Sequence, residues 1–224
     1  MIKTDQINHL LGIKESYQAS DALTKILFDK DKRENLFKAF LDKDCNLDKD
    51  WFHVYFEEEH ANKLKYAQDF TPDSIALLLS RLIGDKSGMR MDVASGTGSL
   101  VIKKWHEDCL AHSPFDFRPS MYFYHCEELS DRAMPFLLFN LMIRGMNAVV
   151  IHGDTLTREA KQVFFIQNDS DDFMKFSNIN VMPHSKQVEE VFDIRRWLEP
   201  EMIHVESSIK VLNRMGVNGI EPFR

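Results

Sequence analysis

The sequence predicts an α/β fold with a mostly parallel sheet, and three features support this prediction. Short strands rich in β-branched and aromatic residues alternate with apolar helices between residues 89 and 154. Turns that contain glycine follow two of these strands, and an acidic residue stands at or just past the end of each strand. Strands joined through helices take right-handed crossovers, which makes neighbouring strands parallel.

Residues 1–66 are expected to form a helical N-terminal region, ahead of a second domain over residues 67–224. Four apolar side chains repeat with the period of one helix face: Leu36, Phe37, Phe40 and Leu41. The polar segment 42–50 interrupts this pattern and lacks the glycine and the closing glutamate of a calcium loop. Three aromatic residues then predict a helix that packs on a core: Trp51, Tyr55 and Phe56.

The second region begins with the segment Gln68-Asp69-Phe70-Thr71-Pro72. Thr71 is suited to cap a helix whose first residue is Pro72, and the apolar run that follows ends at Gly84. A strand over 89–93 leads into a glycine turn and a helix that reaches about residue 111. Gly96 and Gly98 permit a sharp turn and a close approach of a ligand to the backbone.

Two further strands follow in the same pattern. A strand over 121–126 ends at Glu127-Glu128, and an apolar helix over 129–144 leads to a strand over 148–152 that ends in Gly153-Asp154. Weaker patterns predict strands at 163–166 and 177–183. They also predict helices at 188–198 and 201–214.

Composition limits the classes of function. The net charge of −7 is unfavourable for a chain that must hold a nucleic-acid backbone alone, because phosphate contacts need clustered Lys and Arg. We therefore expect either a local basic patch or a basic partner subunit. No segment is apolar enough for a membrane span, and the first residues lack a signal-peptide core, so we expect a cytoplasmic protein. The three separated cysteines indicate reduced thiols, with no metal site.

Three acidic residues predict a ligand site at one edge of the sheet: Asp92, Glu128 and Asp154. The carboxyl ends of parallel strands share an edge, and ligands bind there in open α/β sheets. Acidic residues at strand ends also cap following helices, which is the alternative interpretation. Three such residues together with a glycine turn favour the ligand site. The turn has neither the glycine spacing of a dinucleotide fold nor that of a P-loop.

These landmarks resemble those of the N6-adenine DNA methyltransferases, most closely the modification subunit of type I restriction-modification systems. The resemblance covers residues 60–156. Residues 68–72 are similar to the family's Q-x-F-T-P segment, and 92–98 to its D-P-A-C-G-T-G, with Val93 and Ser95 replacing Pro and Cys. Glu128, Asn140 and Gly145 match the spacing of its Q-E…N…G stretch. Residues 153–156 match its G-D-T-L.

The resemblance implies a Rossmann-like, class I S-adenosylmethionine-dependent methyltransferase fold, truncated after its first strands and preceded by the helical region. The implied cofactor is S-adenosylmethionine, with Glu128 on the ribose, Asp154 near the adenine amino group and Asp92 by the methionyl end. The expected cofactor-binding residues are Phe70, Thr71, Asp92, Ser95, Gly96, Thr97, Gly98, Glu128 and Asp154.

The chain departs from the family at the catalytic motif. That motif, N-P-P-F or N-P-P-Y, holds the target amino group and stacks on the flipped base. This sequence has no Pro-Pro pair, and its nearest candidates are Asn180, Pro183 and His184. Two functions stay open: methyl transfer to adenine in DNA, or a catalytically degenerate protein that regulates or binds a partner. The missing motif also leaves open a subunit that another chain completes as an enzyme. We expect DNA or a protein subunit as partner, and no membrane.

Overall fold

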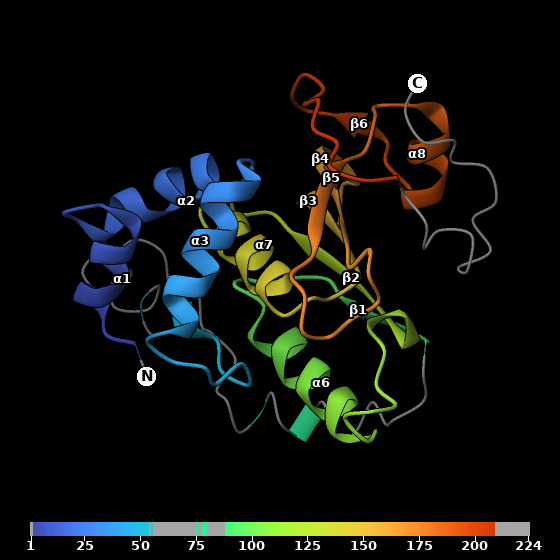
Figure 1. Cartoon of the computed structure of the whole chain (residues 1–224). Coiled ribbons are helices and arrows are strands. Elements are labelled where there is room, and N and C mark those ends of the chain that lie inside the picture. The colour runs from blue at the N-terminus through green and yellow to red at the C-terminus, as the bar shows by residue number, and fades with distance from the viewer. Residues whose placement is uncertain (1, 54, 56–74, 76–77, 80–87, 209–224) are drawn as a thin grey trace. The chain divides into compact units, whose positions relative to one another are not determined.

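The structure, a computed structural model, describes residues 2–53, 55, 75, 78–79 and 88–208 (Figure 1). It divides into two compact units. The first holds the described parts of Met1–Lys86, Ser95–Pro114 and Asp131–Asn140, and the second those of Ser87–Ala94, Phe115–Ser130 and Leu141–Arg224. The boundary expected between residues 66 and 67 lies outside the described residues and stays a prediction.

The described part of the first unit is helical. It contains α1 (Thr4–Leu11), a short 3-10 turn η1 (Ser16–Gln18), α2 (Ala19–Leu27), α3 (Lys30–Leu41) and α6 (Ser99–Leu110). The Asp29 side chain caps α3 by accepting a hydrogen bond from the backbone N–H of Lys32, 3.2 Å away. The helix α7 (Met134–Ile143) starts in this unit and ends in the other.

Aromatic side chains form the core of the first unit. Phe37 and Phe40 of α3 lie 4.9 and 4.8 Å from Phe139 of α7, measured between ring centroids. Phe52 lies 4.7 Å from Phe136 and 5.0 Å from Phe139. These rings are almost fully buried, so the apolar stripe predicted on α3 is confirmed at Phe37 and Phe40.

The second unit is built on a six-stranded sheet with the order β1-β2-β3-β4-β5, and β6 also pairs with β4. The strands are β1 (Gly88–Asp92), β2 (Tyr122–Glu128), β3 (Ala148–Asp154), β4 (Glu159–Gln167), β5 (Asn178–Val181) and β6 (Arg196–Trp197). The pairs β1–β2, β2–β3 and β4–β6 are parallel, while β3–β4 and β4–β5 are antiparallel. The predicted mixture of helices with a mostly parallel sheet is confirmed.

The strand β4 turns back on β3 as a hairpin. Only residues 155–158 separate the two strands, which is too short for a crossover connection, so the pair is antiparallel. Gly153 lies where the two backbones come closest, because a Cβ there would stand 2.4 Å from the Glu159 carbonyl oxygen. The sequence predicts this strand at 163–166; in the structure it begins four residues earlier, at Glu159.

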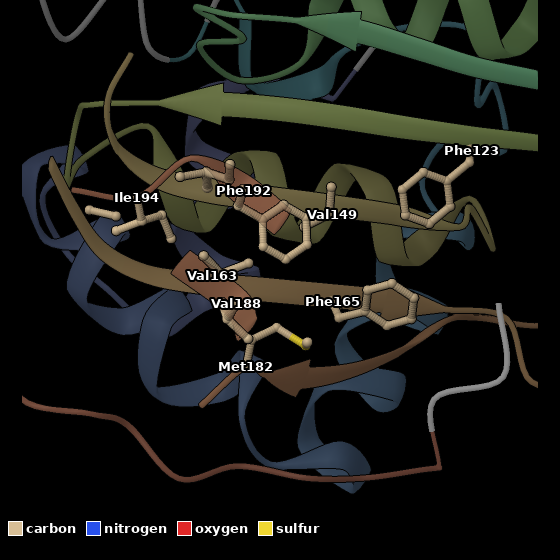
Figure 2. Close-up of a cluster of buried hydrophobic side chains, with 10 residues drawn as sticks. Phe123, Val149, Val163, Phe165, Met182, Val188, Phe192 and Ile194 are labelled. Atoms are coloured by element: carbon tan, nitrogen blue, oxygen red, sulfur yellow. The ribbon is translucent and has the colours of Figure 1, made fainter. Parts of the chain in front are cut away.

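The helix α8 (Lys186–Phe192) covers one face of this sheet. Val188 and Phe192 of α8 pack with Val163 and Phe165 of β4 in a buried apolar cluster (Figure 2). The helix predicted over 188–198 is wrong beyond residue 192. Asp193 takes a left-handed conformation with φ 51°, which ends the helix, and β6 follows.

The helix predicted over 201–214 is wrong for residues 201–208, which are irregular, and the rest lies outside the described residues. Side chains of the sheet accept hydrogen bonds from N–H groups of this segment, and a helix would pair two of these N–H groups internally, those of Glu206 and Ser207. Gln162 accepts from the N–H of Met202, and Asn180 accepts from those of Glu206 and Ser207. Among the described helices, none is long and apolar enough to cross a membrane.

Candidate functional site

The three predicted acidic residues end three neighbouring strands. Asp92 is the last residue of β1, Glu128 is the last residue of β2, and Asp154 is the last residue of β3. In the parallel register Asp92 is level with Cys126, and Glu128 is level with His152, so each acid lies two residues beyond the previous one. Because side chains alternate between the faces of a strand, this register puts all three carboxylates on one face of the sheet.

The surroundings of Asp92 disfavour the charged form of its carboxyl group. Burial and the negative charge of Glu128 together raise the pKa of Asp92 to about 6, against a hydrogen bond from the Ala94 backbone that lowers it. Glu128 is itself 7% exposed and accepts a hydrogen bond from the N–H of Ser130 at 2.7 Å. Two carboxylates in these surroundings favour a ligand with positive charge beside them.

Glu127 has a different role from its neighbour Glu128. Its side chain points to the opposite face, is 1% exposed and pairs with Arg158 at 2.8 Å and His125 at 3.1 Å. Burial raises the pKa of Glu127, but hydrogen bonds from His125, Thr155 and Arg158 and the Arg158 charge outweigh it and hold the pKa at about 2. Glu127 is therefore a structural residue, and Glu128 is the acid that shares a face with Asp92.

Asp154 is the last residue of β3 and stabilises the turn that leads to β4. Its Oδ1 accepts hydrogen bonds from the N–H groups of Leu156 at 2.8 Å and Thr157 at 3.3 Å. This pattern is the ordinary way in which an aspartate fixes a turn. A contact between Asp154 and an adenine amino group stays a prediction.

The glycine turn has the conformation that its sequence predicts. Gly96 and Gly98 have φ of 56° and 98°, values that favour glycine, and α6 begins directly after them. The N–H of Gly98 donates to the Ser95 carbonyl at 2.8 Å. A Cβ on Gly98 would stand 3.0 Å from Leu137 Cδ1, so packing as well as backbone conformation demands glycine here.

Asp50 organises this turn, and the sequence did not single it out. One carboxylate oxygen accepts from the hydroxyls of Thr97 and Ser99, the latter at 2.8 Å. The other accepts from Asn140 Nδ2 at 2.9 Å and from the N–H of Phe52 at 3.0 Å. The only sequence signal was an aspartate at the end of a polar segment, directly before an aromatic helix.

The three catalytic candidates are engaged in structural contacts. Asn180 is fully buried, and its Oδ1 accepts from the N–H groups of Glu206 at 2.7 Å and Ser207 at 3.1 Å. His184 stacks on Trp197 with ring centroids 3.7 Å apart, and Pro183 accepts from the N–H of Ser185 through its carbonyl. Burial lowers the pKa of His184.

Within the sheet, position also separates Asn180 from the first strand. Asn180 lies in β5, and β1 and β5 are the first and last strands of the order β1-β2-β3-β4-β5. Four steps of about 4.8 Å put β5 about 19 Å from the strand that leads into the turn. The structural contacts of Asn180, Pro183 and His184 and the distance of Asn180 from β1 give no support to a role in place of the N-P-P-F motif, and that role stays a prediction.

Two expected cofactor residues, Phe70 and Thr71, lie outside the described residues. Within the part of the chain that the structure describes, no three His, Cys, Asp or Glu side chains group as a metal site.

Comparison with known families identifies the chain at the family level. A profile of the N-6 DNA methylases matches residues 50–193, a segment that begins at Asp50 and includes the glycine turn and all three strand-end acids. A comparison with curated proteins returns no match. The profile covers more than half of the chain. The chain therefore belongs to the N-6 DNA methylase family.

Proposed function

We propose that this protein binds S-adenosylmethionine as part of a system that methylates adenine in DNA. Members of the N-6 DNA methylase family generally use this cofactor. The observation that carries the proposal is the pair Asp92 and Glu128 on neighbouring strand ends, with Asp92 four residues before Gly96 of the glycine turn. Burial and the charge of Glu128 raise the pKa of Asp92 to about 6, and the positive charge of the cofactor's sulfonium and ammonium groups would favour its ionised form.

The start of α6 argues for the same class of ligand. Helix N-termini that follow glycine turns favour phosphate groups, because their N–H groups and dipole attract anions. Here Ser99, the first residue of α6, donates to the Asp50 carboxylate at 2.8 Å. That negative charge disfavours a phosphate at the same place, so a cationic nucleoside fits the turn better than a nucleotide does.

In this proposal the chain's own residues bind and orient the cofactor. Glu128 accepts hydrogen bonds from the ribose hydroxyls, Asp154 approaches the adenine amino group, and Asp92 interacts with the methionyl end. The remaining contacts come from Phe70, Thr71 and the turn residues Ser95, Gly96, Thr97 and Gly98. The cofactor supplies an activated methyl group when bound, and the protein contributes position and electrostatics.

Titration calorimetry with S-adenosylmethionine and its demethylated product tests the binding. We expect wild type to bind both, and Glu128→Ala to raise the Kd by at least about tenfold, since it removes hydrogen bonds to a charged group. Glu190→Ala is the matched control, because Glu190 is an exposed acid of the same unit on α8. Absence of binding by wild type, or equal binding by Glu128→Ala, contradicts the proposal.

A second function is favoured by the missing catalytic motif. The sequence holds no Pro-Pro pair, and the nearest asparagine candidate, Asn180, is buried in β5. We therefore propose that the isolated chain binds cofactor without transferring its methyl group. It then acts as a regulatory protein, or as a subunit that another chain completes. The net charge of −7 favours a protein partner that supplies the basic surface for DNA.

Transfer of label from tritiated cofactor to duplex DNA separates the two functions. We expect background levels from the isolated chain at cofactor concentrations that saturate its site. Robust labelling of adenine would show that the chain is a complete enzyme and overturn the second function.

A further inference from the structure

The Asp50 carboxylate is the centre of a closed hydrogen-bond network around the glycine turn. It accepts from two hydroxyls, one side-chain amide and one backbone N–H, from Thr97, Ser99, Asn140 and Phe52 respectively. A carboxylate offers only acceptors, so all four partners must donate to it. Thr97 and Asn140 are 1% and 0% exposed, so these bonds are largely shielded from water.

The network fixes both the side chain and the backbone of the turn. Asn140 Nδ2 donates to Asp50 and also to the Thr97 carbonyl oxygen, at 2.9 and 2.8 Å. Thr97 is therefore held twice, through its hydroxyl by Asp50 and through its carbonyl by Asn140. Because Thr97 stands between the two glycines with positive φ, these contacts stabilise the backbone conformation on both sides of it.

Glycine makes this support necessary. Glycine permits the positive φ angles of this turn, but it also has the largest backbone freedom of any residue. A turn with two glycines therefore loses much conformational entropy when a ligand orders it. A turn that is ordered before the ligand arrives avoids that loss during binding.

We propose that Asp50 is a positioning residue for the cofactor, which holds the turn of Gly96, Thr97 and Gly98 in its binding conformation in the absence of ligand. The expected effect of Asp50 on cofactor binding rests on the proposed function. The ordering of the turn by Asp50 is a separate property that can be measured without any ligand.

Hydrogen–deuterium exchange of the ligand-free protein tests the ordering directly. In Asp50→Ala we expect the amides of residues 95–102 to exchange at least about tenfold faster than in wild type, since hydrogen bonds to a charged group are lost. Asp50→Asn keeps one acceptor oxygen for Asn140 or Phe52, so we expect partial rescue. Asp42→Asn is the control, because Asp42 is exposed on the same segment.

Calorimetry measures the consequence for the cofactor. We expect the Kd for S-adenosylmethionine to rise about tenfold in Asp50→Asn and more in Asp50→Ala, and to stay unchanged in Asp42→Asn. Thr97→Val removes one donor without removing the carboxylate, and should change exchange and Kd in the same direction. Asp50→Asn should cost less in the Thr97→Val background than in wild type, because the two residues act through one contact.

The outcomes separate the inference from the function on which it rests. If wild type fails to bind the cofactor, the proposed function is wrong, while exchange at the turn still decides the role of Asp50. Unchanged exchange at residues 95–102 in Asp50→Asn and Thr97→Val overturns the inference. So does unchanged affinity in both variants of a protein whose wild type binds. The use of Thr97→Val keeps the test decisive where Asp50→Ala does not fold.

Discussion

Arg158 provides the sharpest test of the structure of the sheet. Its guanidinium donates to the buried Glu127 carboxylate at 2.8 Å, to the Phe192 carbonyl at 2.6 Å and to the Asp193 carbonyl at 3.1 Å. It thus joins the end of β2 to the end of α8. Arg158→Met keeps a long apolar stem and the Cβ at a position with φ 60°, and removes only the charge and its hydrogen bonds.

The expected loss is several kcal/mol in the free energy of unfolding. The pKa of Glu127 falls from 4.5 to about 2 in the folded protein, which corresponds to about 3 kcal/mol at neutral pH for His125, Thr155 and Arg158 together against the cost of burial. Removing one partner of a buried ion pair typically costs about 3–5 kcal/mol, which agrees. Urea denaturation followed by circular dichroism measures the total, and amide exchange in residues 122–128 and 148–167 assigns it to the sheet.

The pH dependence of the variant has a definite sign. Arg158 supplies part of the lowering of the Glu127 pKa, and the hydrogen bonds from His125 and Thr155 remain in Arg158→Met, so the pKa of Glu127 should rise from about 2 towards its ordinary value of 4.5. In wild type the low pKa confers stability that is present above pH 4.5 and is lost as pH falls towards 2. The variant should therefore lose less stability than wild type over the same fall in pH.

Two further variants isolate the cause. Arg158→Met combined with Glu127→Gln should be more stable than Arg158→Met alone, because the double variant has no buried carboxylate that has lost its arginine partner. Arg196→Met removes an ion pair with Glu159 whose arginine side chain is 66% exposed, and should cost less than about 1 kcal/mol. Equal stability of Arg158→Met and wild type at pH 7 would refute the reasoning.

Three other predictions follow from the same structure. Cofactor affinity should fall about tenfold between pH 7 and pH 5, as Asp92 with a pKa of about 6 becomes protonated, and calorimetry of Asp92→Asn should show no such change. Gly145→Ala should destabilise the protein by about 3 kcal/mol in urea denaturation, because φ is +64° and a Cβ would stand 2.3 Å from the Lys175 carbonyl oxygen. Phe139→Ala should cost about 3–5 kcal/mol in the same assay, since its ring is fully buried against three others.

The sequence predicted those parts of the fold whose signals are local. The strand ends at Asp92, Glu128 and Asp154 were found because β-branched and aromatic runs stop at turn residues there. The choice of Glu128 over Glu127 came from spacing, and the register supports it on independent grounds, because Glu128 and Asp92 share a face.

The parts that the sequence did not predict depend on contacts between distant residues. Asp50 lies 47 residues from Thr97 and 90 from Asn140, and no local pattern shows that one carboxylate accepts from both. Residues 201–208 have apolar spacing that suits a helix, but Gln162 and Asn180 take their N–H groups. Local propensity is overridden in both places by hydrogen bonds that only the folded chain can form.

Cofactor binding and catalysis make different demands on this sheet. A cofactor needs the ends of adjacent strands, and β1, β2 and β3 supply them in sequence order. Methyl transfer needs acceptor groups for the adenine amino hydrogens within about 3 Å of the target nitrogen, next to the methyl group. The chain turns back after β3 into the antiparallel strand β4, so each later strand of the order lies farther from β1. Asn180 on β5 lies about four strand spacings of 4.8 Å from β1. If the isolated chain nevertheless methylates adenine, we expect its amino-group acceptor to come from residues other than Asn180, Pro183 and His184. Asn180→Ala should then leave the rate per folded molecule unchanged, although it removes buried hydrogen bonds to Glu206 and Ser207.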